Sequence, residues 1–297
     1  MSGTHGIDRR LPPLPALDGV RHRDIAIEGV RLHVAEVGPE SGEPVLFVHG
    51  WPQHWWCWRK VVAQLPESRC VMPDLRGHGW SEAPDNGYEK AQLAADMRNL
   101  LDALEINRVC YVGHDWGAWA GFLLATQSPE RVSALLALSV PHPWPSRHDR
   151  LSPRRLAAML YQIPLSTPLL GRGMMRGGIV KRILNGASAP GTFSAEEAAV
   201  YDGLLSSAEG AKVTVAMYRT FLLRELPALM SGDQRRLTVK TRLVVGEQDP
   251  IVRGADLRGF EEHAADMAVE WVAGADHFLP EERPGLVVDR VREICAV

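Results

Sequence analysis

Short apolar runs alternate with amphipathic segments along most of the chain. Five runs are almost continuously apolar, as expected for strands buried on both faces: residues 44–49, 69–72, 108–112, 134–140 and 242–245. A sixth run, 268–272, is more polar. Apolar positions about 3.6 residues apart predict helices at residues 55–65, 90–104, 118–127, 255–263 and 284–295. This alternation predicts an α/β fold whose mostly parallel sheet is flanked by helices on both faces.

Two regions depart from the alternation. Residues 23–27 and 30–37 alternate polar and apolar positions around Glu28-Gly29, which predicts a hairpin and brings the expected sheet to eight strands. Between about Trp144 and Thr238 no strand-like run recurs, which predicts a helical cap inserted over one end of the sheet. The expected domains are therefore a core of residues 20–144 and 239–297 and a cap of residues 145–238.

Composition narrows the expected partners and compartment. Lys plus Arg is 33 and Asp plus Glu is 36, so the net charge of −3 gives no reason to expect binding to nucleic acid or an anionic membrane. No apolar run approaches the length of a membrane span, and residues 1–17 lack the apolar stretch of a signal peptide. A cytoplasmic protein is expected, with residues up to about Gly19 forming a loose arm over its surface.

The four cysteines, Cys57, Cys70, Cys110 and Cys295, form no CxxC pair. In a cytoplasmic protein of this kind, all of them are expected to be reduced thiols. No Asp/His cluster has the spacing of metal ligands, and no glycine-rich phosphate loop opens a helix, so neither a metal nor a cofactor is expected.

Three reactive residues follow strand-like runs, where parallel sheets bind their ligands. They are Asp115, Asp249 and His277, in the chain order acid, acid, histidine. Singly, each has an ordinary explanation: Asp115 as a helix N-cap, Asp249 as a turn residue, His277 as a surface histidine. Their joint placement favours a catalytic triad.

The segment GHDWG (residues 113–117) places aspartate in a strand-turn-helix elbow where many hydrolases have serine. Glycine is needed on both sides because a side chain would collide in so sharp a turn. A carboxylate is ionised at pH 7 without a base and suits attack on a saturated carbon. The product would be an ester on Asp115, hydrolysed by water that His277 activates while Asp249 orients the imidazole.

Several segments together resemble the soluble epoxide hydrolase family of the α/β-hydrolase fold. They are HGWP at 49–52, PDLRGHGWS at 73–81, GHDWG at 113–117, VPHP at 140–143, GEQDP at 246–250 and DHFLP at 276–280. The resemblance spans the core and is weakest in the cap. It implies a cis Trp51–Pro52 bond, an oxyanion hole formed by the backbone N–H groups of Trp51 and Trp116, and a pocket lined by Trp51, Trp116 and Pro52.

The family also uses cap tyrosines as proton donors to the opening epoxide oxygen. Tyr218, in Met217-Tyr218-Arg219, resembles one of these sites. Tyr161 lies near the other, although many relatives have their tyrosine where this chain has Ala157. Tyr161 either donates from a shifted register or packs in the cap, leaving Tyr218 as the only donor. A third candidate, Tyr201, is disfavoured because residues 196–205 predict an exposed helix.

The expected activity is hydrolysis of a small hydrophobic epoxide to a vicinal diol by a monomer or homodimer. The alternative is a haloalkane dehalogenase with the same nucleophile. Such enzymes hold the halide with an indole after the nucleophile plus an asparagine in the His-Gly loop or a cap tryptophan. Trp116 fits the first condition, but position 51 is not asparagine and no tryptophan occurs within residues 145–238. A non-catalytic binding protein of the same fold is a third, less favoured reading, because the triad is complete.

Overall fold

The eight strands form a single sheet. The computed structural model describes residues 11–144, 160–231, 235–252 and 254–295. Its strand order is β1-β2-β4-β3-β5-β6-β7-β8, and only β2 runs antiparallel to its neighbours. The strands are β1 (Arg21–Ile27), β2 (Val30–Val37), β3 (Pro44–Val48), β4 (Arg69–Pro73), β5 (Val109–His114), β6 (Val132–Leu138), β7 (Thr241–Gly246) and β8 (Met267–Val272). The predicted hairpin and mostly parallel sheet are confirmed.

The register brings the carboxyl ends of the central strands to one edge. Val48 of β3 is paired with Gly113 of β5, and His114 is paired with Leu138 of β6. Leu138 is in turn level with Val244 of β7. The loops that leave these four strands therefore begin side by side, which is the condition for residues far apart in sequence to share one site.

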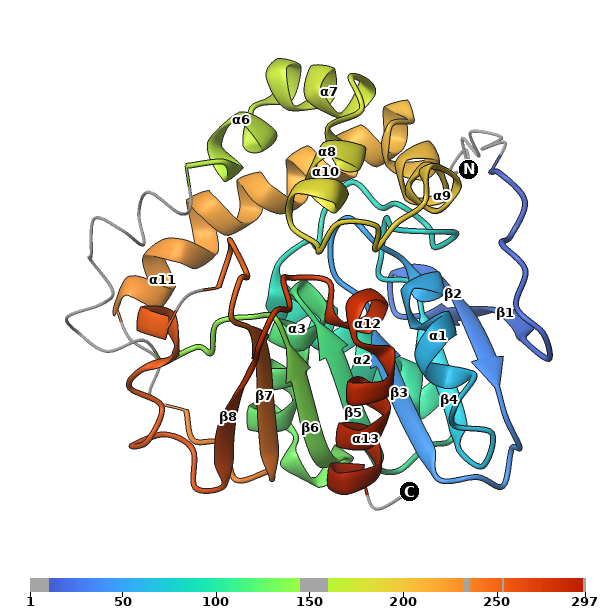
Figure 1. Ribbon diagram of the computed structural model, residues 1–297, viewed down its shortest axis with the longest axis vertical. Coiled ribbons are helices and arrows are strands. Elements are labelled where there is room, and N and C mark those ends of the chain that lie inside the picture. The colour runs from blue at the N-terminus through green and yellow to red at the C-terminus, as the bar shows by residue number, and fades with distance from the viewer. Residues whose placement is uncertain (1–10, 145–159, 232–234, 253, 296–297) are drawn as a thin grey trace, which may run out of the picture.

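Helices cover both faces of the sheet, as predicted (Figure 1). On one face lie α1 (Arg59–Val62) and α13 (Pro284–Cys295), and on the other α2 (Lys90–Ala103) and α3 (Trp116–Gln127). The short helix α12 (Leu279–Glu282) precedes α13. The predicted helix at 55–65 is two pieces, a 3₁₀ turn η1 (Trp55–Trp58) and α1. The short 3₁₀ turn η2 (Pro129–Arg131) leads into β6.

The predicted helix at 255–263 is wrong. Only a 3₁₀ turn, η4 (Gly254–Leu257), forms there. Gly259 has a φ of 99°, in the left-handed region, which ends any helix at that point. Ala264 then pairs with Leu237 in an isolated parallel bridge. The periodic apolar positions of this segment thus pack a turn rather than a helix.

The described chain between β6 and β7, residues 160–231, is helical and lies over the carboxyl edge of the sheet (Figure 1). We refer to it as the inserted helices. They are α6 (Gln162–Ser166), α7 (Pro168–Arg176), α8 (Ile179–Gly186), α9 (Ala195–Leu205), α10 (Ala208–Thr220), the π-helical segment η3 (Phe221–Glu225) and α11 (Leu226–Ser231). None of the helices in the described parts of the chain combines the length and apolar character needed to cross a bilayer.

The expectation that residues 196–205 form an exposed helix is wrong in part. Helix α9 begins with a capping box between Ser194 and Glu197 and has an exposed face. Its other face is buried, however, and the Tyr201 hydroxyl donates a hydrogen bond to Glu281 Oε1 (2.7 Å) on α12. Alanines and leucines spaced between the acidic residues supply this second face. Tyr201 therefore anchors α9 to the core.

The N-terminal arm is not loose where it is described. The indole N–H of Trp80 donates to the Pro12 carbonyl (2.9 Å), and that of Trp56 donates to the Ala16 carbonyl (3.4 Å). Two tryptophans of the core therefore hold residues 11–18 against the surface. Proline-rich composition alone did not reveal these partners.

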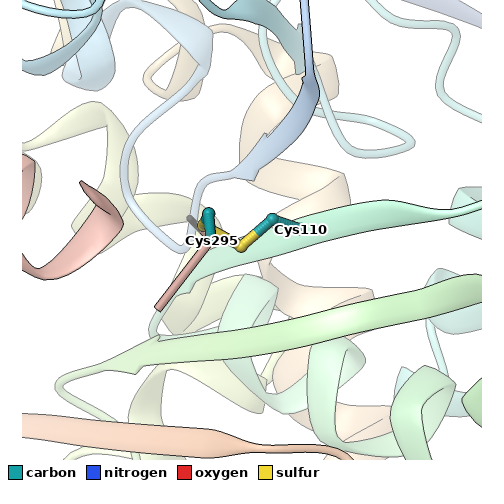
Figure 2. The surroundings of a disulfide bond; sticks show 2 residues. All are labelled: Cys110 and Cys295. Atoms are coloured by element: carbon teal, nitrogen blue, oxygen red, sulfur yellow. A yellow bond between two sulfur atoms is a disulfide. The ribbon is translucent and has the colours of Figure 1, made fainter. Parts of the chain in front are cut away.

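The expectation of four reduced cysteines is also wrong. Cys110 in β5 and Cys295, the last residue of α13, form a disulfide with Cα atoms 5.5 Å apart (Figure 2). The two residues are 185 positions apart in sequence, so no local spacing of cysteines predicts the bond. Cys57 and Cys70 are buried free thiols, and burial raises the pKa of Cys70 to about 12. The disulfide fastens the C-terminal helix to the strand that leads to Asp115.

We expect the urea-denatured, unreduced protein to expose two reactive thiols, and four after reduction. Cys295→Ser should lower the free energy of unfolding by about 2–4 kcal/mol, since the closed loop is long. Thiol titration and urea denaturation measure the two effects, with Cys70→Ser as the control that removes a thiol but no bond. Four reactive thiols without reductant would contradict the assignment.

Candidate active site

Asp115 lies at the tip of a sharp elbow between β5 and α3. Its φ of 49° and ψ of −123° are unusual for a residue with a side chain, a conformation that costs about 1–3 kcal/mol and persists only where neighbouring contacts fix it. Its backbone N–H donates to the Leu138 carbonyl of β6 (3.0 Å), and its carbonyl accepts from the N–H of Trp119 (3.0 Å). The elbow therefore holds the Asp115 carboxyl at the carboxyl edge of the sheet.

The glycines of the elbow leave no room for side chains. A Cβ on Gly113 would lie 2.5 Å from Ala118 Cα, and one on Gly117 would lie 2.3 Å from the Val48 carbonyl oxygen. Real Cβ atoms do not approach backbone this closely, so neither position accepts another residue without moving the strand or the helix. The steric requirement predicted from the GHDWG pattern is confirmed.

Two backbone N–H groups face the Asp115 carboxyl. The Trp51 N–H donates to Oδ2 (2.9 Å), and the Trp116 N–H is the second donor. Burial raises the pKa of Asp115 to about 6, and His277, the two N–H donors and Lys90 limit the rise. At pH 7 a group with this pKa is still roughly nine-tenths ionised. The N–H groups of Trp51 and Trp116 thus occupy the positions expected of an oxyanion hole.

A neutral histidine, His49, fixes the loop that carries Trp51. The Trp51–Pro52 bond is cis, as expected. The Nδ1–H of His49 donates to the Gly50 carbonyl (2.9 Å), and its Nε2 accepts from the N–H of Leu75 (3.0 Å). Burial lowers the pKa of His49 to about 3, so the ring remains neutral and can accept at Nε2.

Asp74, in the PDLRGHGWS segment, ties this loop to its neighbours. Its buried carboxylate accepts the backbone N–H groups of Trp55 (2.8 Å) and Trp80 (2.9 Å) and the Nδ1–H of His33 (2.8 Å). Burial alone would raise its pKa, but the hydrogen bond and charge of His33 and the neighbouring histidines hold the pKa of Asp74 at about 2. The HGWP loop therefore rests on a charge-assisted network rather than on packing alone.

Asp249 and His277 form a buried hydrogen-bonded pair. His277 Nδ1–H donates to Asp249 Oδ2 (2.9 Å). Asp249 Oδ1 accepts the N–H groups of Ile251 (2.7 Å) and Val252 (3.0 Å), which fixes the carboxylate. Burial alone would lower the pKa of His277, but Asp249 and then Asp115 raise it above its usual value. The pair leaves Nε2 of His277 free to act on the cavity side.

His114 supports the histidine loop rather than the chemistry. Its Nε2–H donates to the His277 carbonyl (2.9 Å), and burial keeps the pKa of His114 well below its usual value. This histidine therefore hydrogen-bonds beside the elbow. It links the strand before Asp115 directly to the backbone of His277.

Asp115 and His277 border a cavity of about 350 Å³ between the sheet edge and the inserted helices. Trp51, Tyr161 and Tyr218 also line it, and most of the remaining wall is apolar: Leu165, Met174, Ile179, Ile183, Ala187, Pro250, Ile251 and Phe278. The volume fits a small organic molecule. Nucleophile, histidine and tyrosines predicted from separate segments therefore face one space.

The two predicted tyrosines lie next to each other. The rings of Tyr161 and Tyr218 meet edge to face, with centroids 6.2 Å apart. The exposed fraction is 2% for Tyr218 and 36% for Tyr161, so only Tyr161 reaches the surface. Burial raises the pKa of both phenols; the negative charge of Asp115 is the next cause for Tyr161, whereas for Tyr218 it follows the effect of Tyr161. Both phenols therefore stay protonated at neutral pH. Ala157, the position where many relatives have tyrosine, lies outside the described residues.

Two residues expected to line the pocket do not border this cavity: Trp116 and Pro52. Trp116 packs behind Tyr218, with ring centroids 6.1 Å apart. Pro52 is buried in the cis-proline turn. The resemblance that placed both residues in the pocket did not reveal that neither reaches this cavity.

Two other residues near the site were not foreseen. Thr214 Oγ1 accepts the indole N–H of Trp51 (3.1 Å). Its position four residues before Tyr218 on α10, and so on the same helix face, was a signal that could have identified it. Lys90 is completely buried against Trp116, and nothing in its sequence neighbourhood predicts that burial.

In the described parts of the chain, no group of three or more His, Cys, Asp or Glu side chains has the arrangement of a metal site. Around Asp115, His277 pairs with Asp249 and Lys90 pairs with Glu225.

Comparison with known proteins agrees with this geometry. A family model described as the alpha/beta hydrolase fold matches residues 43–164. The soluble epoxide hydrolase of Corynebacterium sp. (strain C12) is 30% identical over 281 residues, covering 91% of this chain and 95% of its own length. Epoxide hydrolase 2 of Caenorhabditis elegans is 25% identical, over 95% of this chain and 81% of its own. A solved structure, epoxide hydrolase CorEH without ligand, superposes with a TM-score of 0.82 at 28% identity, covering 93% and 99% of the two chains. The chain is therefore a hydrolase that belongs to the soluble epoxide hydrolase family of the α/β-hydrolase fold.

Proposed function

We propose that this protein hydrolyses small hydrophobic epoxides to vicinal diols through a covalent ester on Asp115. The observation that carries the proposal is the pairing of Tyr161 and Tyr218 on the wall of the cavity that Asp115 borders. A nucleophile and two proton donors on one apolar cavity suit a ring whose carbon is attacked while its oxygen must be protonated. The relatives named epoxide hydrolases support the same substrate class.

In the first step the Asp115 carboxylate attacks a ring carbon, the C–O bond breaks and the oxygen takes a proton from a tyrosine. An aliphatic alkoxide is a stronger base than a phenolate, so this transfer is favourable even though the pKa of both phenols is raised. Tyr218 is the principal donor in this proposal, and Tyr161 supports or shares the role. The phenolate is later reprotonated from water.

In the second step water attacks the ester carbonyl, and His277 takes one proton of that water. The tetrahedral intermediate then expels the diol oxygen, which receives this proton from His277. The Asp115 carboxylic acid that remains loses the second proton to solvent, which restores the carboxylate and balances the reprotonation of the phenolate. Before attack, the Asp115 charge contributes to the raised pKa of His277. Ester formation neutralises that charge, so the pKa of His277 falls when the neutral imidazole is needed as a base. Asp249 keeps the ring oriented and stabilises the imidazolium that forms. The site thus changes from attack to hydrolysis without any movement of residues.

The oxyanion of the second step develops on the Asp115 carboxyl. The N–H groups of Trp51 and Trp116 already face that carboxyl in the resting state. They would stabilise the tetrahedral intermediate without reorganisation, which is where such donors are most effective. Residues 145–238 act in this proposal as a cap that supplies the tyrosines and closes the cavity.

Halide release is less well supported by the same site. The indole N–H of Trp51 is engaged by Thr214, and the Trp116 side chain does not border the cavity. Neither indole is therefore placed to receive a halide ion from a substrate in this space.

A panel of styrene oxide, aliphatic epoxides and bromoalkanes tests the activity. Epoxides should yield diol, and bromide release should be slower by roughly 10²-fold or more, since leaving-group protonation is the assistance this site provides. A single turnover in heavy-oxygen water should leave label in the peptide that contains Asp115. An unlabelled peptide despite turnover would refute the ester mechanism.

His277→Gln should still form the ester but hydrolyse it slowly, because only the second step needs a base. Mass spectrometry of the intact protein after mixing with epoxide should show the mass of one substrate added at Asp115. His114→Gln is the matched control, since His114 only positions the backbone of His277. Full turnover by His277→Gln would remove this histidine from the mechanism.

Tyr218→Phe should slow ester formation by roughly 10²-fold, the usual scale of general-acid catalysis, and leave ester hydrolysis nearly unchanged. Tyr161→Phe distinguishes the two tyrosine roles: a comparable loss assigns both as donors, and a loss of only a few-fold assigns Tyr218 alone. Stopped-flow tryptophan fluorescence separates the steps. Unchanged rates in both variants would mean that water protonates the oxygen.

A further inference from the structure

Lys90 is a fully buried cation beside the catalytic elbow. It is the first residue of α2, and its side chain has no exposed surface. Its Nζ lies 4.2 Å from the centroid of the Trp116 ring and 5.1 Å from that of Phe221. Removing an ammonium group from water costs several kcal/mol unless partners compensate, and an apolar residue would fill the same space without that cost.

The compensating partner comes from the inserted helices. Glu225, the last residue of η3, accepts a hydrogen bond from Lys90 Nζ at Oε2 (2.9 Å) and one from the Lys90 backbone N–H at Oε1 (2.7 Å). The residue that precedes α2, Glu89, makes no side-chain cap of its own. Glu225 therefore both pairs the buried cation and caps the first turn of a core helix from another layer of the molecule.

This pair joins the segment that carries Tyr218 to the residue that follows Asp115. Phe221 stands three residues after Tyr218, at the start of η3, and packs on Trp116 with ring centroids 5.0 Å apart. Tyr218 itself meets the Trp116 ring edge to face at 6.1 Å. Lys90 lies over Trp116 of the core and pairs with Glu225 of the inserted helices. One side chain therefore contacts both the elbow and the segment that carries Tyr218.

The π-helical segment η3 lies between Tyr218 on α10 and Glu225 at its own end, so it sets how these two side chains are rotated relative to each other. A π-turn adds one residue to a helical path and shifts every side chain after it relative to those before. Here Tyr218 lies on α10, before the π-helical segment, and Glu225 is the last residue of that segment. The position of Glu225 on Lys90 thus fixes the rotation of the helix that presents the phenol.

We propose that the Lys90–Glu225 pair is a positioning device that sets Tyr218 against Asp115 for the opening of the substrate ring. The proposal rests on the proposed function for its effect on rate, but the placement of Tyr218 can be measured without any substrate. Neither residue borders the cavity, so each acts through Trp116, Phe221 and the helix rather than on the reacting atoms.

The charge of Lys90 has a second, independent consequence at Asp115. The groups that face the Asp115 carboxyl are His277 from the loop after β8, Lys90 from α2, the two backbone N–H donors, and the phenols Tyr161 and Tyr218 from the inserted helices. The groups that face Lys90 are Glu225, Asp115 and Glu89. Lys90 lowers the pKa of Asp115, so its removal should move the acid limb of the kcat/KM profile to higher pH.

The test compares Lys90→Met and Glu225→Gln with the control Lys212→Met. Lys212 pairs with Asp85 (2.6 Å) between the same helix α10 and the core, but at the surface and away from Tyr218. The first two variants should slow ester formation by roughly 10- to 100-fold, as expected for a misplaced catalytic group, with KM changed less than about 3-fold. Lys212→Met should remain within about 2-fold of the parent, as for exposed pairs.

Coupling to Tyr218 separates positioning from a general loss of stability. In a Tyr218→Phe background, Lys90→Met should cost little further rate, because the donor that it positions is already absent. The acid limb of Lys90→Met should lie at higher pH than that of Lys212→Met. Additive losses together with an unmoved acid limb would overturn the proposal.

A measurement without substrate distinguishes failure of this proposal from failure of the proposed function. With 3-fluorotyrosine at position 218, the fluorine chemical shift should change in Lys90→Met and Glu225→Gln and stay at the parent value in Lys212→Met. If the protein opened no epoxide, the proposed function would be wrong. The fluorine chemical shift would still show whether Lys90 and Glu225 position Tyr218. Parent-like shifts in both buried-pair variants would overturn the placement. If Lys90→Met did not fold, Glu225→Gln, which keeps the shape and one acceptor, would carry the test.

Discussion

The site depends on keeping a carboxylate ionised against the wall of an apolar cavity. Burial alone drives the pKa of Asp115 upward, and it stops at about 6 because charges and dipoles oppose it. Two backbone N–H groups, an imidazole and a buried ammonium surround one carboxyl group, and each comes from a different segment of the chain. The sharp elbow, the cis-proline loop, the histidine loop and the start of α2 are all placed so that these groups converge. An unopposed rise in pKa would leave the Asp115 carboxyl protonated at neutral pH, and so unable to attack as proposed.

The sequence predicts the core of the fold and part of the site, because some of their constraints are local and others are not. Continuous apolar runs and the glycines of the elbow are local signals, since a strand buried on both faces and a turn without space each constrain the residues within them. Asp115, Asp249 and His277 followed from their positions just after such strands. The contacts that support the site from other layers did not, because Glu225 on Lys90 and Tyr201 on Glu281 join segments whose separation in sequence carries no periodic pattern.

The errors have similar physical origins. The segment at 255–263 has helical periodicity, but Gly259 takes a left-handed φ that no periodicity count includes. Cys110 and Cys295 were taken for reduced thiols because composition and compartment were the only guides, whereas the bond depends on the end of α13 reaching Cys110 in β5. Trp116 was expected in the pocket because the family resemblance implies it there. The first turn of α3 instead directs its ring toward Lys90 and Phe221, behind Tyr218.

Among the ionic contacts between the inserted helices and the core, those at α9 and at η3 differ in character. At α9, Glu197 and Tyr201 join Arg59, Lys60 and Glu281 in a network that reaches the surface. At η3, Glu225 meets the fully buried Lys90, and Arg224 pairs with Glu89 beside them. Charges within the α9 network can exchange partners, so the loss of one leaves others to compensate. Lys90 has no exposed surface, so the loss of Glu225 would leave an uncompensated buried charge. In the proposed reaction Tyr218 has to meet the ring oxygen while Asp115 attacks its carbon, and a buried pair suits a contact that must be accurate. The network at α9 would then hold the inserted helices on the core, and the Lys90–Glu225 pair would set the geometry of Tyr218.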